Sequence, residues 1–347
     1  MYDLWEQAQL GPLMLKNRTV RSATNEHLSE PDGRLTQVWA DTLIELAKYQ
    51  VGLIITGHFT VDGTQRADEG QPVMDERADL DLLRLAADGV HAYGGKLVAQ
   101  LSHSGPKAAA GVNGVPAKGP ADFTPAELDQ LVENFVSAAK RCQQAGFDGV
   151  QIHNAHGYLL SSFLNPQTNL RTDKYGGSLE NRFRLTERIM KAVRAACGKD
   201  FALLVKVDSN SCRDFHGLLS LMEKAGIDGA EVSGLDFSAR TGSKEPFYLR
   251  ELEAAREGTS LPLILVGGIF SLSTAQEVLA AGVPFVSFCR ALICQPDFIA
   301  LMRSGEQVES SCLACNGCYK IYRQRPVRCV QHTAPLPQLS KVFGCQV

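Results

Sequence analysis

The chain alternates short, continuous apolar runs with longer segments in which apolar residues recur every three or four positions. Continuous runs are typical of strands buried on both faces, and the longer period is typical of helices with one buried face. The predicted strands are RTVRSAT (18–24), VGLIITG (51–57), KLVAQLS (96–102), GVQIH (149–153), ALLVKV (202–207), GAEVS (229–233), PLILVGG (262–268) and PFVSFCR (284–290).

The segments between these strands are predicted to be helices. The clearest helix begins after Thr124, which is expected to cap it, with Pro125 in the first turn and Glu127 at the capping-box position. A helix end, a glycine turn and a strand start recur together in AGFDGV (145–150), AGIDGA (225–230) and, as a variant, AGVPFV (281–286). This repetition is what a series of β/α units requires.

Eight β/α units in series predict an α/β fold of the (β/α)8 TIM-barrel type. The expected domains are the barrel within residues 1–305 and a short cysteine-rich extension, packed on the barrel, at 306–347. A doubly wound open sheet is the alternative architecture. Its most informative marker, G-x-G-x-x-G after a strand, does not occur in the sequence.

Composition narrows the class of protein. The 347 residues are 44% hydrophobic and 21% charged, which favours a globular domain with a large core over a disordered chain. A net charge of −3 argues against nucleic acid as a partner. The first residues lack a basic-then-apolar segment, and the apolar runs are shorter than the roughly 20 residues of a membrane span. We therefore expect a cytoplasmic protein that does not bind membranes.

In such barrels, the chemistry gathers at the C-terminal ends of the strands. Those ends carry small and polar residues here: Thr24, Gly57, Gln100, His153, Lys206, Ser233, Gly267, Gly268 and Arg290. Glycines and an arginine after the last two strands fit a phosphate site, although such glycines are also ordinary in turns. Gln100 and Lys206 are expected to face one another across the mouth and could hold a heterocycle. The alternative for Lys206 is an ion pair with Asp208 or Glu231.

Several segments together identify a family. HNAHGYLLSSFLNPQTNLRTDKYGGSLENRFR (153–184) resembles the fourth-strand signature of the Old Yellow Enzyme family of FMN-dependent oxidoreductases. Other landmarks of that family occur in the right order as LKNRTVRSAT (15–24), QLSHSG (100–105), LVGGIFS (265–271) and CRALICQPDF (289–298). The resemblance covers essentially the whole barrel, and it implies FMN at the C-terminal mouth.

The resemblance also implies roles for individual residues. His153 and His156 would donate hydrogen bonds to a substrate carbonyl oxygen, and Tyr158 would be the general acid that protonates the substrate. An isolated pair of histidines could equally be structural or bind a metal ion. The residues expected to bind FMN are Ala23, Thr24, Gly57, Gln100, Lys206, Ser233, Gly267, Gly268, Cys289 and Arg290.

The extension carries four cysteines in the pattern C-x2-C-x2-C-x10-C, at Cys312, Cys315, Cys318 and Cys329. Three close thiolates and one remote thiolate are typical of a 4Fe–4S cluster, whereas zinc sites more often pair two C-x2-C motifs. Zinc and free thiols are the alternatives. Interleaved cationic residues, Lys320, Arg323, Arg325 and Arg328, would stabilise an anionic cluster. Cys345 is unassigned, and Cys142, Cys197, Cys212, Cys289 and Cys294 are expected among apolar neighbours.

The tail resembles the iron–sulfur branch of the family, which includes trimethylamine dehydrogenase and bacterial 2,4-dienoyl-CoA reductase. The predicted function is the FMN-dependent reduction of an activated C=C bond in a small enone or enoyl substrate. Electrons would come from NAD(P)H directly or from a redox partner protein through the cluster, and the protein could be a homo-oligomer. The alternatives are an amine or demethylating dehydrogenase, an electron-transfer subunit with little activity of its own, and, more distantly, a phosphate-binding isomerase on the same fold.

Overall fold

The computed structural model describes residues 2–321 and 326–331. Its parallel strands close into a ring because β4 pairs with both β3 and β6, and β11 pairs back onto β3. In ring order they are β3 (Thr19–Arg21), β4 (Leu53–Ile55), β6 (Lys96–Ser102), β7 (Gly149–Asn154), β8 (Ala202–Asp208), β9 (Gly229–Ser233), β10 (Leu263–Val266) and β11 (Phe285–Phe288). The predictions of the eight strands and of a TIM barrel are confirmed, and the open-sheet alternative is excluded.

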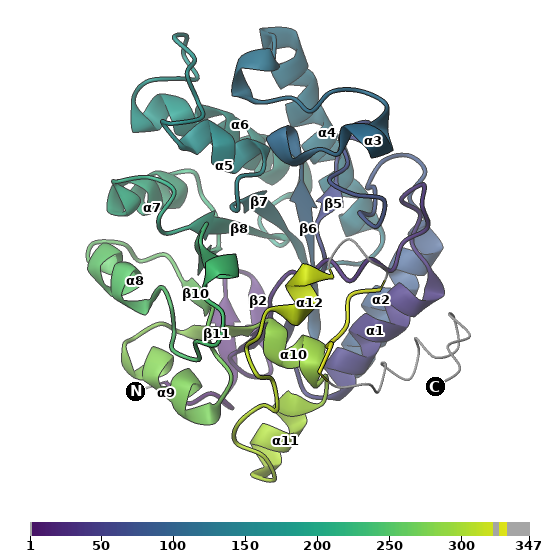
Figure 1. The fold of residues 1–347 in the computed structure, drawn as a ribbon, viewed down its shortest axis with the longest axis vertical. Coiled ribbons are helices and arrows are strands. Elements are labelled where there is room, and N and C mark those ends of the chain that lie inside the picture. The colour runs from purple at the N-terminus through teal and green to yellow at the C-terminus, as the bar shows by residue number, and fades with distance from the viewer. Residues whose placement is uncertain (1, 322–325, 332–347) are drawn as a thin grey trace.

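Helices surround the ring (Figure 1). The longer ones are α1 (Gln37–Lys48), α2 (Leu80–Ala92), α4 (Pro125–Gln144), α6 (Leu179–Cys197), α7 (Phe215–Lys224), α8 (Leu249–Arg256) and α9 (Leu272–Ala280). Shorter ones are α3 (Ala110–Asn113), α5 (Leu159–Leu164), α10 (Arg290–Cys294), α11 (Phe298–Ser304) and α12 (Gly317–Lys320). Within residues 2–321 and 326–331, none of the helices combines the length and the apolar character that a membrane crossing requires.

The predicted helix start at Thr124 is confirmed. The Thr124 hydroxyl accepts a hydrogen bond from Glu127 N at 3.3 Å, and the Glu127 carboxylate accepts one from Thr124 N at 2.8 Å. This reciprocal arrangement satisfies two backbone donors that the first turn of a helix otherwise leaves unpaired. Pro125 costs no hydrogen bond at the first helical position.

A hairpin that the sequence pattern did not predict closes the N-terminal end of the barrel. Its antiparallel strands are β1 (Ala8–Leu10) and β2 (Leu13–Leu15). Their inward residues join an apolar cluster inside the ring that includes Leu53, Val98 and Ile264. A further short strand, β5 (Phe59–Thr60), extends the sheet beside the end of β6. One end of the cylinder is therefore filled, and the opposite end is available for a site.

The described part of the cysteine-rich extension contacts the barrel mouth. Asn316 donates to Ser238 O at 3.0 Å and accepts from the Arg290 guanidinium at 2.5 Å, and Gly242 N donates to Ala314 O at 2.9 Å. Arg323, Arg325 and Cys345 lie outside the described residues. The boundary at residue 305 remains a prediction.

Candidate active site

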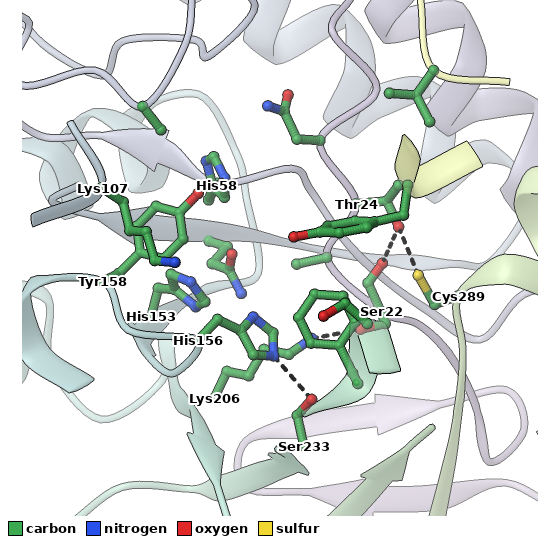
Figure 2. A pocket seen from close by; sticks show the side chains of 18 of the residues that line it. Ser22, Thr24, His58, Lys107, His153, His156, Tyr158, Lys206, Ser233 and Cys289 are labelled. Carbon is green, nitrogen blue, oxygen red and sulfur yellow. Dashed lines mark hydrogen bonds between the residues drawn. The ribbon is translucent and has the colours of Figure 1, made fainter. Parts of the chain in front are cut away.

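A cavity of about 1040 Å³ opens at the C-terminal ends of the strands. Most of the predicted site residues line it, which brings together segments from seven strands of the ring and the loops that follow them. They are Ala23, Thr24, Gln100, His153, His156, Tyr158, Lys206, Ser233, Gly267, Cys289 and Arg290. Figure 2 shows the polar side chains of this set converging on one space.

Gly57 and Gly268 were also predicted to bind the cofactor, but neither lines this cavity as the described residues form it. A Cβ at Gly57 would lie 2.6 Å from the backbone oxygen of Thr24, so glycine allows two strand ends to approach closely. Gly268 has φ +77°, and its Cβ would lie 1.6 Å from the oxygen of Glu245. Both glycines shape the backbone around the cavity and do not line it.

The turn after β7 places the three predicted catalytic side chains on one wall. His156 and Gly157 both adopt left-handed backbone angles, with φ 61° and 74°. Asp208, at the end of β8, accepts a hydrogen bond from His156 N at 2.6 Å and thereby holds this uncommon conformation. The ring centroid of His153 lies 5.4 Å from that of His156 and 4.8 Å from that of Tyr158.

Both histidines of this wall are neutral at physiological pH. Burial lowers the pKa of His153 and His156 well below the ordinary histidine value, and neighbouring histidines and Lys206 lower it further. The Nε2 atom of His156 lies 2.9 Å from the Ser233 hydroxyl. His153 is 2% exposed, and neither of its ring nitrogens has a hydrogen-bond partner within the described part of the chain. An unpaired buried donor costs about 1–3 kcal/mol, so His153 is arranged for a partner that the protein does not supply.

The floor of the cavity is a buried polar network. Lys206 Nζ donates to the Ser22 hydroxyl at 2.7 Å and lies 3.2 Å from Glu231 Oε2. Gln151 connects this pair to Gln100: it donates to Glu231 at 3.0 Å and accepts from Gln100 at 2.7 Å. Burial would raise the pKa of Glu231, but the Lys206 charge and three hydrogen bonds bring it below its ordinary value. The ion pair with Glu231 that was the alternative for Lys206 is thus present.

The opposite side of the cavity combines a glycine, whose backbone no side chain covers, with a cationic side chain. Gly267 has φ +123° and lines the cavity without a side chain. The Arg290 guanidinium is anchored by Asn316 and Ala314 O, at 2.5 and 3.3 Å, and lies 5.0 Å from the ring centroid of Phe270. A guanidinium group held beside the backbone of a glycine is suited to binding a phosphate group.

A sequence profile of the NADH:flavin oxidoreductase / NADH oxidase family matches residues 3–309. The chain belongs to this family. The prediction of the family is therefore confirmed.

Individual relatives agree with this assignment. The chain is 29% identical to an NADH oxidase of Thermoanaerobacter brockii, over 94% of its own length and 55% of the relative's. It is 33% identical to a metal reductase of Desulforamulus reducens, over 95% of its own length and 53% of the relative's. It is 30% identical to a 4,4'-dithiodibutanoate disulfide reductase of Rhodococcus erythropolis, over 91% of its own length and 92% of the relative's. The chain thus spans about half the length of the first two relatives.

Solved structures share the fold. A 2-naphthoyl-CoA reductase in complex with 2-naphthoyl-CoA superposes with a TM-score of 0.87 at 24% identity, over 93% of this chain and 56% of that one. An Old Yellow Enzyme homologue from Zymomonas mobilis superposes with a TM-score of 0.79, also at 24% identity, over 90% and 95%. These likenesses support the barrel fold of the NADH:flavin oxidoreductase family.

The cavity fits FMN, the cofactor that this family implies. Its volume suits a cofactor with a substrate beside it, since pockets for single ligands measure roughly 300–1,000 Å³. The donors around Arg290 and Gly267 match a phosphate, and the Gln100 and Lys206 side chains reach the same space from the floor. Among the described residues, the two ring nitrogens of His153 on the wall have no hydrogen-bond partner. The donor types and the space therefore agree with FMN and a bound substrate.

Four cysteines of the extension, Cys312, Cys315, Cys318 and Cys329, line a second, small cavity together with Cys294. In the described residues, no set of three or more histidine, cysteine, aspartate or glutamate side chains is arranged to hold a metal ion. The donor set has the chemistry of an iron–sulfur site, but its metal geometry is not formed here. Of the cysteines expected among apolar neighbours, Cys142 and Cys197 are in the core, and Cys212 and Cys294 are partly buried and pack against it. Cys289 lines the large cavity, and Cys294 also lines the small one.

Sequence reasoning missed His58 and Gln71. His58 lines the large cavity, and its Nε2 lies 3.0 Å from the Tyr158 hydroxyl oxygen. Its Nδ1 lies 3.0 Å from Gln71 Nε2. His58 directly follows Gly57, at the end of the second predicted strand. The rule that site residues follow strand ends could have found it, whereas nothing local marks Gln71.

Proposed function

We propose that the chain is an FMN-dependent oxidoreductase that reduces an activated C=C bond of an enone or enoyl type. The observation that carries this proposal is the wall on which two neutral imidazoles and a phenol lie together, with both ring nitrogens of His153 unpaired in the described structure. Neutral imidazoles can donate hydrogen bonds to a carbonyl oxygen.

The wall residues would act on the carbonyl oxygen and the α-carbon of the substrate. FMN, when bound, supplies a hydride to the β-carbon of the substrate. Negative charge then builds on the carbonyl oxygen, and N–H donors of His153 and His156 stabilise it because they are already in place. Tyr158 donates its hydroxyl proton to the α-carbon. The substrate thereby gains a hydride and a proton across one double bond.

The remaining cavity residues would hold the cofactor. Gln100 and Lys206 are proposed to contact the flavin ring, with Ala23, Thr24, Ser233 and Cys289 around it, and Gly267 and Arg290 to hold its phosphate. Glu231 and Ser22 contact Lys206 in the buried network and compensate its loss of water. A fixed positive charge favours electron density on a neighbouring ring.

We also propose that Cys312, Cys315, Cys318 and Cys329 ligate a 4Fe–4S cluster. The support is their spacing, their place around one small cavity, and the position of Cys318, which lines the large cavity as well. Electrons would reach the site from NAD(P)H directly or from a partner protein. A small-molecule substrate, a homo-oligomeric assembly and a cytoplasmic location remain predictions.

Visible spectroscopy and rapid mixing test the function. Protein purified without oxygen is expected to show a flavin spectrum, to bleach when mixed with NADH or NADPH, and to recover its colour when an enone such as 2-cyclohexenone is added. Bleaching of the flavin by an amine as electron donor, with no recovery of colour on addition of enones, would instead support a dehydrogenase. Protein that binds no FMN after reconstitution would overturn the proposal.

Replacement of Tyr158 by phenylalanine tests the acid. Tyr158→Phe is expected to slow enone reduction by about 10²- to 10⁴-fold, the usual contribution of general acid catalysis, with flavin reduction by NAD(P)H nearly unchanged. Tyr93→Phe, at an exposed position outside the cavity, is the matched control. An equal loss in both half-reactions for Tyr158→Phe would remove the acid role.

Iron and sulfide analysis tests the cluster separately. We expect about four irons and four sulfides per chain, and a loss of both in Cys318→Ser. Cys197→Ala, which changes a cysteine in the core, serves as the control. Zinc in place of iron, or metal content that is insensitive to Cys318→Ser, would refute the cluster without affecting the flavin chemistry.

A further inference from the structure

His58 occupies a place beside the proposed acid that no role above uses. It follows β4 and lines the cavity, and Figure 2 shows the Tyr158 hydroxyl directed toward it. The His58 Nε2 to Tyr158 oxygen distance is 3.0 Å, and the two ring centroids lie 5.1 Å apart. A hydrogen bond between these rings therefore exists, and its direction decides what His58 can do.

The direction follows from Gln71, whose amide orientation is fixed at both ends. Its Oε1 accepts from the backbone N–H of Ala67 at 2.6 Å, and its Nε2 donates to the backbone oxygen of His58 at 3.3 Å. Because a backbone N–H can only donate and a carbonyl oxygen can only accept, the amide cannot be reversed. The same Nε2 lies 3.0 Å from His58 Nδ1, so Nδ1 must be the acceptor.

A neutral imidazole whose Nδ1 accepts carries its hydrogen on Nε2. The burial of His58 lowers its pKa, which keeps the ring neutral. The Lys206 charge acts in the same direction, while Asp68 and a backbone hydrogen bond of His58 itself oppose it without reversing the shift. His58 is therefore a donor to the phenol oxygen, and the phenol hydrogen is not used in this bond.

We propose that His58 is a positioning residue for Tyr158: its Nε2–H holds the phenol oxygen without using the hydroxyl hydrogen, and it stabilises the phenolate formed after proton transfer. This inference rests on the proposed function for its catalytic meaning. In the step itself, the Tyr158 O–H bond breaks, a C–H bond forms at the substrate α-carbon, and the electron pair stays on the phenol oxygen. Water then returns a proton to the phenolate.

A hydrogen bond to a charged group changes an equilibrium by about 10- to 100-fold, so His58 should lower the pKa of Tyr158 by about one to two units. Other titratable groups also face the pair: His153 from β7, Lys206 from β8, and Asp68 and Lys107 from the loops. These groups are unchanged when His58 alone is replaced. The difference between variants therefore isolates the contribution of His58.

The test measures the ionisation of Tyr158 directly. In the flavin-loaded protein, the tyrosinate absorbance is titrated with pH for the wild type and for His58→Phe, each against its Tyr158→Phe counterpart, so that only Tyr158 contributes. We expect the pKa of Tyr158 to rise by about one to two units in His58→Phe and to return part of the way in His58→Gln, which restores an N–H donor. Gln71→Leu, which releases the tautomer, should give a smaller rise.

The exposed His216, replaced by phenylalanine, is the control and should leave the titration unchanged. Reoxidation of the reduced flavin by an enone should slow by about 10- to 100-fold in His58→Phe, and reduction by NAD(P)H should not. An unshifted Tyr158 titration in His58→Phe overturns this inference even if enones are reduced. A shifted titration in a protein that reduces no enone supports the inference and refutes the proposed function.

Discussion

Asp208 provides a quantitative test of how burial acts on this site. The side chain is fully buried at the end of β8, where it accepts hydrogen bonds from His156 N and the Ser161 hydroxyl at 2.6 and 3.2 Å. Burial raises the pKa of Asp208 from 3.8 to about 7, and the hydrogen bonds and the Lys206 charge offset only part of this effect. The folded protein therefore retains a proton that the unfolded chain has already lost near pH 4.

The free energy of unfolding depends on this difference in bound protons. Between pH 4 and pH 7 the folded state binds one more proton at Asp208, so stability must fall as the pH rises through this window. The contribution is fully present below the unfolded pKa and is lost once the pH exceeds the folded pKa. At about 1.4 kcal/mol per pKa unit, the whole change is on the order of 4 kcal/mol.

Asp208→Asn removes the titration and keeps an oxygen that can accept both hydrogen bonds. Urea unfolding of the wild type and Asp208→Asn from pH 5 to pH 8 should show the variant gaining about 2–3 kcal/mol relative to the wild type, with no further gain above pH 8. The infrared band of protonated carboxyl groups at pH 5 should be weaker in the variant than in the wild type by the contribution of Asp208.

Asp75→Asn is the matched control because the pKa of Asp75 is lowered: burial, which would raise it, is outweighed by the side-chain and backbone hydrogen bonds from Arg77 and by the Arg77 charge. Its contribution is lost only as the pH falls below the range of the experiment, so its difference curve should be flat. A flat curve for Asp208→Asn as well would show that the Asp208 carboxyl is ionised in the folded protein, and the argument from burial would be wrong.

Two further predictions concern stability. Lys206→Met should lower the free energy of unfolding, measured with urea, by about 3–5 kcal/mol because Glu231 would remain buried without its cation. Adding Glu231→Gln to this variant should recover most of the lost stability. A double variant as unstable as the single one would contradict this account. Gly268→Ala should lower the free energy of unfolding by more than the roughly 1 kcal/mol expected for Gly242→Ala. Both glycines have a positive φ near 80°, but among the described residues only Gly268 has a neighbouring atom, Glu245 O, where the new Cβ would lie. Equal losses of stability in thermal unfolding would refute this steric argument.

The barrel was predictable because its strands have a strong local signal. Strands such as β6 and β8 are buried along nearly their whole length, so they appear in the sequence as continuous apolar runs. The hairpin of β1 and β2 had no such signal. Each strand has three residues with only two of them buried, and Gln9 and Met14 point outward. Only the ring that surrounds Leu10 and Leu15 explains their burial.

The wall of the site was predictable for a similar reason. His153, His156 and Tyr158 lie within six residues of one another, and one turn of the chain presents all three. The partner of Tyr158 is different, because 100 positions separate it from His58 along the chain. No periodicity or motif relates positions that far apart. Their contact depends on the ring order, in which β6 stands between β4 and β7.

The polar groups at the barrel mouth fall into two sets: those that hold the structure of the site and those expected to contact the substrate. Gln151, Glu231 and Lys206 satisfy one another, so the cost of burying them is met within the protein. His153 is equally buried, yet it has no partner in the described structure. An unpaired imidazole lowers stability, and it is retained in a folded chain when a ligand completes it. The satisfied network therefore fixes the site, and the unsatisfied histidine marks where the substrate oxygen is expected to bind.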